Sequence, residues 1–138
     1  MIKFVVGPKG SGKTKWLIDQ ANEQKKEGNG NIVFIDSDEK HIFSLDHDVR
    51  LIDASQYSVS DQNTLYGFLA GIVSRDNDIE KVYLDGVYSI VEFEDIDKFL
   101  EKLEELSANN KVDFLIGMNK AKDELPENYK NDAVELEA

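Results

Sequence analysis

The residues best suited to chemistry lie near the start of the chain, where glycines, a lysine and a threonine are spaced as G-x-x-x-x-G-K-[ST]. The eight residues of this pattern are Gly7, Pro8, Lys9, Gly10, Ser11, Gly12, Lys13 and Thr14. Glycines at these positions permit backbone conformations with positive φ, so that successive N–H groups can point at one anion. The pattern therefore predicts a phosphate-binding loop in which all eight residues bind a nucleotide.

Two side chains of this loop have chemical roles of their own. We expect Lys13 to contact the β- and γ-phosphates as a positive charge and to act as a catalytic residue, and the Thr14 hydroxyl to ligate Mg²⁺. Asp85 ends an apolar run, where a carboxylate can hold the same ion. Its alternative role is to accept a hydrogen bond in the turn that leads into Gly86. The predicted metal ligands are therefore Thr14 and Asp85.

The elements that must position these residues alternate along the chain. Buried strands are predicted by the apolar runs at residues 2–6, 32–35, 49–53, 81–85 and 112–117. Helices are predicted by one-sided apolar patterns within residues 14–21, 61–73 and 96–106. Parallel strands need crossover connections, so this alternation predicts an α/β fold with a mainly parallel sheet covered by helices on both faces.

The predicted sheet also gathers polar residues at one edge. In such folds ligands bind at the carboxyl ends of the strands. Four residues fall at these ends: Gly7, Asp36, Asp85 and Asn119. We therefore expect the nucleotide to lie at this edge of the sheet.

A chain of 138 residues fits one domain. We expect residues 1–119 to form the nucleotide-binding domain. Residues 120–138 are polar and contain Pro126, which predicts a short helix or a loose tail. In the middle helix, Gly67 and Gly71 lower helix propensity by about 1 kcal/mol each, and we expect them to mark close packing.

Composition restricts the partners. The net charge of −12 repels phosphate backbones, which makes nucleic acid a poor partner. The absence of cysteine excludes disulfides and thiolate chemistry. The apolar run at the N-terminus is too short for a signal peptide, and no run approaches the ~20 residues of a membrane span. We therefore expect a cytoplasmic protein without a membrane span.

Acidic residues and both histidines lie close together between residues 36 and 48. This segment begins like a calcium-binding loop, but it lacks the glycine at the sixth position and the glutamate at the twelfth. His41 and His47 are not spaced as metal ligands. We expect an acidic loop over the nucleotide site, ordered when a γ-phosphate binds.

Three further segments resemble the RecA-like ATPases. The run from Phe34 to His41 is similar to the strand end that delivers their catalytic carboxylate. The run from Val82 to Val87 resembles their metal-binding strand. The run from Phe114 to Asn119 resembles the strand whose polar end senses the γ-phosphate. The resemblance implies a three-layer P-loop NTPase fold with RecA-like strand order.

The same resemblance implies roles for particular residues. Asp38 or Glu39 would be the catalytic base that polarises water, and Asn119 would bind the nucleotide. The chain departs from the pattern because Gly86 replaces the usual serine and because no feature prefers Asp38 over Glu39. The chain also lacks the basic DNA-binding loops of RecA. It looks most similar to small single-domain P-loop proteins of Firmicutes that are labelled ATP-binding or twitching-motility ATPase-like.

The predicted function is Mg²⁺-dependent ATP binding with slow ATP hydrolysis. Hydrolysis is expected to be slow because Arg50 and Arg75 are the only arginines that could stabilise the transition state. The first alternative is a regulatory module that binds ATP without hydrolysing it. The second is a small-molecule kinase, which the scarcity of arginine disfavours. A guanine-reading Asn-Lys-x-Asp motif is absent, and an unidentified protein partner or self-association stays open.

Overall fold

The computed structural model describes residues 1–28, 30–37 and 44–137. Its strands are β1 (Ile2–Val6), β2 (Asn31–Asp36), β3 (Arg50–Asp53), β4 (Ile79–Leu84), β5 (Asp113–Met118) and β6 (Val134–Glu135). Its α-helices are α1 (Lys13–Glu27), α2 (Gln62–Arg75), α3 (Ile96–Asn110) and α4 (Glu127–Lys130). Single 3₁₀ turns cover Ala54–Tyr57, Val87–Ser89 and Lys122–Glu124. Strands and helices therefore alternate as the sequence predicts.

The strands form one sheet in the order β3-β2-β4-β5-β1-β6. Every neighbouring pair in this sheet is parallel. The predicted mainly parallel sheet with RecA-like strand order is confirmed. Because all strands run the same way, the carboxyl ends of β1, β2, β4 and β5 lie along one edge of the sheet.

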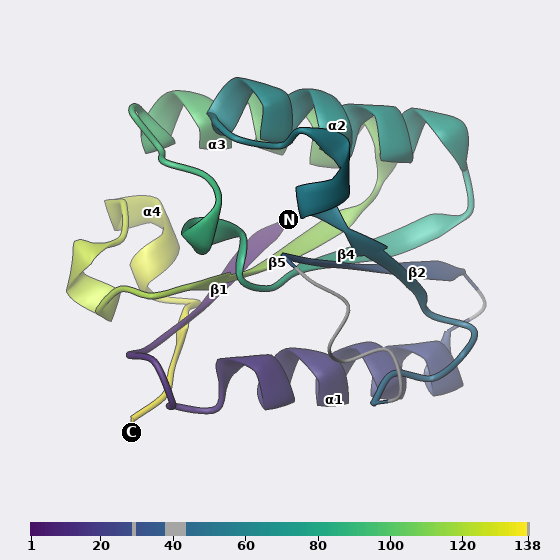
Figure 1. The fold of residues 1–138 in the computed structure, drawn as a ribbon, viewed down its shortest axis with the longest axis horizontal. Coiled ribbons are helices and arrows are strands. Elements are labelled where there is room, and N and C mark those ends of the chain that lie inside the picture. Colours follow the sequence, from purple (N-terminus) through teal and green to yellow (C-terminus); the bar gives the residue numbers. More distant parts are fainter. Residues whose placement is uncertain (29, 38–43, 138) are drawn as a thin grey trace.

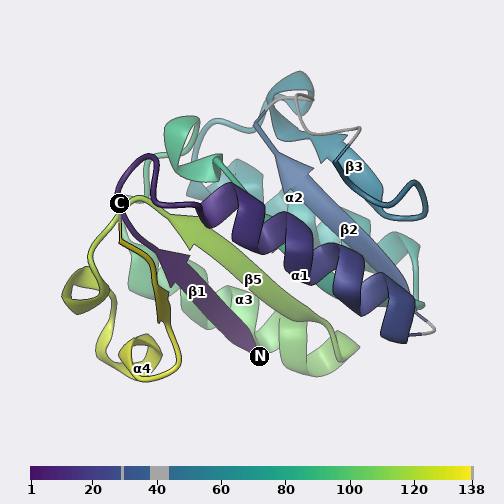
Figure 2. The same ribbon diagram turned by 90° about the horizontal axis from the view of Figure 1, so that it is seen from below.

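Helices cover both faces of the sheet and make three layers. Figure 1 shows α2 and α3 on one face and α1 on the other, and Figure 2 shows α1 lying over the sheet between β5 and β2, nearly along the direction of β5. Neighbouring residues of a strand point to opposite faces. In β1, Phe4 packs into the core under α2 and α3, whereas Val5 packs into the core under α1. The continuous apolar runs in the sequence reflect this burial on both faces.

The helices follow the apolar patterns of the sequence. In α2, the Asp61 carboxylate accepts a hydrogen bond from Thr64 N, and the Thr64 side chain bonds back to the Asp61 backbone in a capping box. The longest helices, α1 and α3, have 15 residues each. None of the helices in the described parts of the chain has the length and hydrophobicity that a membrane span requires.

The expected close packing at Gly67 and Gly71 is wrong. A Cβ atom placed at either position has no other atom within 4 Å, apart from its own helix and neighbours. Both glycines therefore face open space on α2, and their cost to helix propensity has no packing contact to offset it.

The segment after residue 119 is tied to the sheet. It contains the short helix α4, and Leu125 and Ala133 are buried. It then forms β6, in which Val134 pairs with Val5 and Glu135 with Val6. The polar sequence of this segment predicts a short helix or a loose tail, and strand β6 is not part of that prediction. We propose that residues 120–137 belong to the same folding unit as residues 1–119.

Candidate nucleotide-binding site

The glycine-rich segment forms the connection between β1 and α1. Gly12 is the N-cap residue of α1 and has φ of +96°, which strongly favours glycine. Gly7 is restricted by space, because a Cβ atom there would lie 2.5 Å from Leu136 O. The Ser11 N–H donates to Pro8 O at 3.1 Å, which closes the loop. The strand, loop and helix thus follow each other as a phosphate-binding loop requires.

The Lys13 side chain is folded back along this loop. Its Nζ donates to Gly7 O at 2.7 Å and to Pro8 O at 2.9 Å, and the residue is only 5% exposed. Burial lowers the pKa of the Lys13 ammonium, and the nearby Asp85 carboxylate acts in the opposite direction. The lysine charge is therefore held against the first two residues of the loop.

Thr14 and Asp85 come together although 71 positions separate them in the sequence. Thr14 Oγ1 donates to Asp85 Oδ2 at 2.8 Å, and Asp85 is 4% exposed. Asp85 N also donates to Ile35 O at 2.8 Å, which fixes the end of β4 against β2. A hydroxyl and a carboxylate side by side are oxygen donors of the kind that Mg²⁺ prefers. These oxygen donors fit the predicted Mg²⁺, because in nucleotide sites the remaining coordination positions of this ion are filled by phosphate oxygens and water.

Asp36 is also close to these residues. Its place at the end of an apolar run predicts a position at the ligand-binding edge of the sheet, but the sequence suggests no role for it. It is the last residue of β2, is 3% exposed, and shares a cavity of about 970 Å³ with Lys13, Thr14 and Asp85. Its Oδ1 accepts a hydrogen bond from Ser37 N at 2.7 Å. Asp36 ends an apolar strand just as Asp85 does, and that shared signal was available in the sequence. The predicted bases Asp38 and Glu39 lie outside the described residues.

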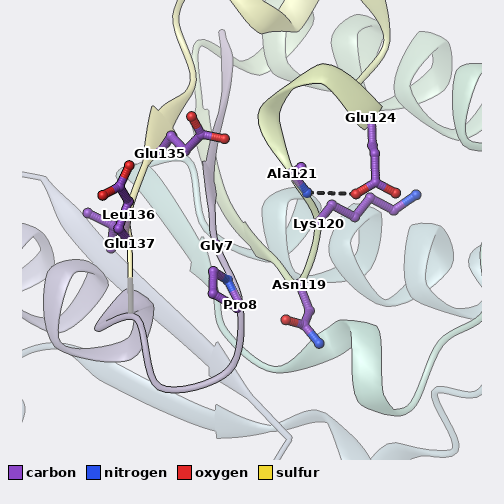
Figure 3. Close-up of a pocket in the computed structure, with 9 residues that line it drawn as sticks. All are labelled: Gly7, Pro8, Asn119, Lys120, Ala121, Glu124, Glu135, Leu136 and Glu137. Carbon is purple, nitrogen blue, oxygen red and sulfur yellow. Dashed lines mark hydrogen bonds between the residues drawn. The ribbon is translucent and has the colours of Figure 1, made fainter.

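Asn119 lies on the other side of the loop. It is exposed, follows β5, and lines a cavity of about 490 Å³ with Gly7, Pro8, Glu135 and Leu136. Figure 3 shows Gly7 and Pro8 between Asn119 and the C-terminal strand. Asn119 is not among the residues that line the larger cavity. The structure therefore brings Asn119 to the start of the loop but not to the side where Thr14 and Asp85 meet.

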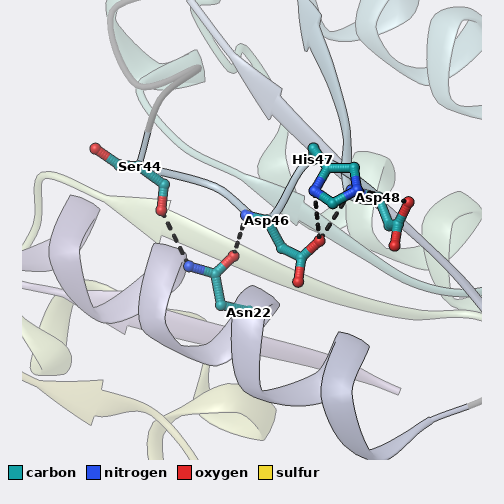
Figure 4. Close-up of polar contacts among 5 residues, drawn as sticks. All are labelled: Asn22, Ser44, Asp46, His47 and Asp48. Atoms are coloured by element: carbon teal, nitrogen blue, oxygen red, sulfur yellow. Dashed lines mark hydrogen bonds and ion pairs between the residues drawn. The ribbon is translucent and has the colours of Figure 1, made fainter.

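The described part of the acidic segment is held against α1. Asn22 Nδ2 donates to Ser44 O at 3.0 Å, and Asp46 N donates to Asn22 Oδ1 at 2.7 Å (Figure 4). His47 is exposed. Its Nδ1 lies 3.8 Å from Asp46 Oδ1, and its Nε2 lies 3.6 Å from Asp48 Oδ1. Within residues 1–28, 30–37 and 44–137, no group of three or more acidic or histidine residues is placed to hold a metal. His41 and the centre of the expected acidic loop lie outside the described residues.

Comparisons with known proteins show the fold. The flagellar accessory protein FlaH from Methanocaldococcus jannaschii superimposes with a TM-score of 0.58 over 94% of this chain, at 13% sequence identity. The chain has a RecA-like P-loop fold. It spans 65% of the length of the FlaH chain, so the RecA-like core matches only part of that protein. No protein-family model and no curated protein sequence matches the chain.

Proposed function

We propose that the protein binds ATP with Mg²⁺ and hydrolyses it slowly. The observation that carries the proposal is the Thr14–Asp85 hydrogen bond beside the Lys13 ammonium, because these three groups match the needs of a metal-bound polyphosphate. The loop amides and the N-terminus of α1 supply further positive potential for phosphate. The RecA-like P-loop fold is consistent with this role.

Each residue has a separate task in this proposal. The loop residues from Gly7 to Thr14 cradle the phosphates, and Lys13 neutralises charge that develops on the β- and γ-phosphates. Thr14 and Asp85 would hold Mg²⁺, which would act as a Lewis acid and neutralise negative charge on the phosphates. A carboxylate at the end of β2 polarises the attacking water. Among the described residues, Asp36 is the candidate for this task. Asp38 and Glu39 are the other two candidates.

The positions of the two arginines explain why hydrolysis should be slow. Arg50 and Arg75 line one shallow groove of about 390 Å³ together with Asn31 and Ile79. Asn31 and Ile79 are the first residues of β2 and β4, so this groove lies at the amino ends of the strands. The phosphate loop lies at the opposite, carboxyl ends. Neither arginine is therefore placed to stabilise transferring phosphate in the same chain, and a faster reaction needs a lysine of this chain, such as Lys9 at the same cavity, or a cation from a protein partner or a second copy.

The decisive experiment measures ATP binding and phosphate release on the same samples of wild type and Lys13→Ala. Lys26→Ala is the matched control, since Lys26 is an exposed lysine in the last turn of the same helix. We expect Lys13→Ala to lose binding and release, and Lys26→Ala to retain both. Asp85→Asn should remove the increase in ATP affinity that Mg²⁺ gives the wild type. Release that is unchanged in Lys13→Ala would contradict the proposal.

Two other outcomes correspond to the alternatives. Saturable, Lys13-dependent ATP binding without phosphate release would indicate a regulatory module that responds to nucleotide loading. Transfer of the γ-phosphate to a sugar or nucleoside in a substrate screen would indicate a kinase. We propose the cytoplasm, where ATP and Mg²⁺ are both available, as the location.

A further inference from the structure

An aromatic ring stands beside the lysine of the phosphate loop. Tyr88 lies in the 3₁₀ turn Val87–Ser89, which follows Asp85 directly after β4. Lys13 Nζ lies 5.9 Å from the centroid of the Tyr88 ring. Tyr88 is half-buried and lines both the 970 Å³ cavity and a neighbouring cavity of about 640 Å³. It therefore forms part of the wall between the phosphate site and the adjoining space.

The surroundings of the Lys13 ammonium favour contact with an aromatic ring. The ammonium has lost most of its water, and its two described hydrogen-bond acceptors, Gly7 O and Pro8 O, are neutral carbonyls. The face of an aromatic ring carries partial negative charge, and its attraction for a cation strengthens when water is excluded. The ring also attracts the ammonium without carrying a formal negative charge. A negative charge at this place would repel phosphate.

We propose that Tyr88 is a positioning residue that holds the Lys13 ammonium at the phosphate loop through the face of its ring. Its effect on ATP rests on the proposed function, but the contact with Lys13 exists without nucleotide. Burial, followed by the charges of Asp85 and Asp36, raises the pKa of the Tyr88 hydroxyl. The ring, rather than the hydroxyl, carries the effect.

The first test observes the contact in nucleotide-free protein. The lysine side chains are labelled with ¹³C, and the Lys13 methylene next to Nζ is assigned from the signal that disappears in Lys13→Met. We expect a ring-current shift at this methylene in wild type and in Tyr88→Phe, and its loss in Tyr88→Leu. An identical Lys13 signal in wild type and Tyr88→Leu would overturn the proposal.

The second test measures ATP affinity in the same variants. Tyr88→Phe should bind within about twofold of wild type, and Tyr88→Leu should bind about 3- to 10-fold more weakly, the range of a partly desolvated cation–π contact. Tyr66→Leu is the control, because it removes a ring that lies 4.3 Å from Lys102 Nζ, between α2 and α3. It should leave ATP affinity unchanged.

The outcomes separate this proposal from the proposed function. Equal losses in Tyr88→Phe and Tyr88→Leu would assign the effect to the hydroxyl and overturn the role of the ring. Wild-type protein that shows the ring-current shift but binds no ATP would refute the proposed function and leave the Tyr88–Lys13 contact established. A loss of affinity in Tyr66→Leu as large as in Tyr88→Leu would show a general packing effect and refute the positioning role.

Discussion

Asp36 and Asp85 are two buried carboxylates at the ends of parallel strands, yet their surroundings differ. Asp85 accepts from Thr14, the other predicted metal ligand, whereas Asp36 accepts from the backbone of Ser37. At the level of single residues, we propose that Asp85 holds the metal and that Asp36 polarises the water. The two roles can be separated, because a metal ligand affects binding and a base affects turnover.

We therefore expect Asp36→Asn to retain Mg-ATP binding and to lower the rate of phosphate release by roughly 10²- to 10⁴-fold, the usual contribution of a general base. Asparagine keeps the size of the side chain but cannot accept the proton. The measurement is single-turnover hydrolysis beside equilibrium binding, with Asp38→Asn and Glu39→Gln run in parallel. Normal turnover in Asp36→Asn together with a loss in either of the other variants would move the base to residue 38 or 39.

The buried Tyr83 should make the free energy of unfolding depend on pH in the alkaline range. Its ring is 1% exposed, its hydroxyl donates to Gln20 O at 3.3 Å, and burial raises its pKa to about 12. The unfolded chain loses this proton near pH 10, so between about pH 10 and 12 the folded state binds more protons than the unfolded state. The contribution of protonated Tyr83 to the free energy of unfolding is therefore complete below about pH 10. It is lost as pH rises through 12, and this loss amounts to about 2 to 3 kcal/mol.

Urea unfolding at pH 8, 10 and 11 tests this expectation. The free energy of unfolding should fall above pH 10, and it should fall less steeply in Tyr83→Phe. Part of the fall should persist in that variant, since Tyr88 and Tyr129 also have raised pKa values. Parallel curves for the two proteins would show that Tyr83 does not carry the pH dependence.

Helix α2 offers a prediction at the scale of an element. Gly67 and Gly71 are interior helical residues, and the space that an alanine methyl group would occupy at each of them is free. Replacing either by alanine should raise the free energy of unfolding by about 0.5 to 1 kcal/mol, because alanine loses less backbone entropy in a helix. Thermal or urea unfolding of each single variant and of the double variant provides the measurement. A destabilised variant would show that α2 does not accept a methyl group at that position.

The elements also show what the sequence could predict. The glycine-rich connection between β1 and α1 and the strands beside it were predictable, because glycine spacing and long apolar runs are strong local signals. Strand β6 was not, since its two residues, Val134 and Glu135, give no strand pattern in a polar segment, and its pairing with β1 is a tertiary contact. The roles of Asp36 and Tyr88 depend on which side chains share a cavity, which spacing in the sequence does not reveal.

The charge of the whole molecule leads to a further prediction. A net charge of −12 on 138 residues makes the compact state repel itself, and dissolved salt screens this repulsion. We expect the free energy of unfolding to rise as NaCl increases from about 0.01 to 0.15 M, over which the Debye length falls from about 30 to 8 Å. Urea unfolding at several salt concentrations measures the effect, with an equivalent series in a neutral osmolyte as control. A decrease with salt would mean that attractive ion pairs outweigh the repulsion.

The sheet order has a consequence for how the chain becomes functional during synthesis. β1 is made before the other strands of the sheet, but its neighbours, β5 and β6, are made after all the others. A nascent chain that has not yet reached residue 113 can pair β2 with β3 and β4, while β1 and the loop that follows it have no strand to join. The ribosome releases residues from the N-terminus onward, so β1 and the loop after it emerge before the strands that flank them. If ATP binds at this loop as proposed, it stabilises only chains that have been synthesised past β5 and β6.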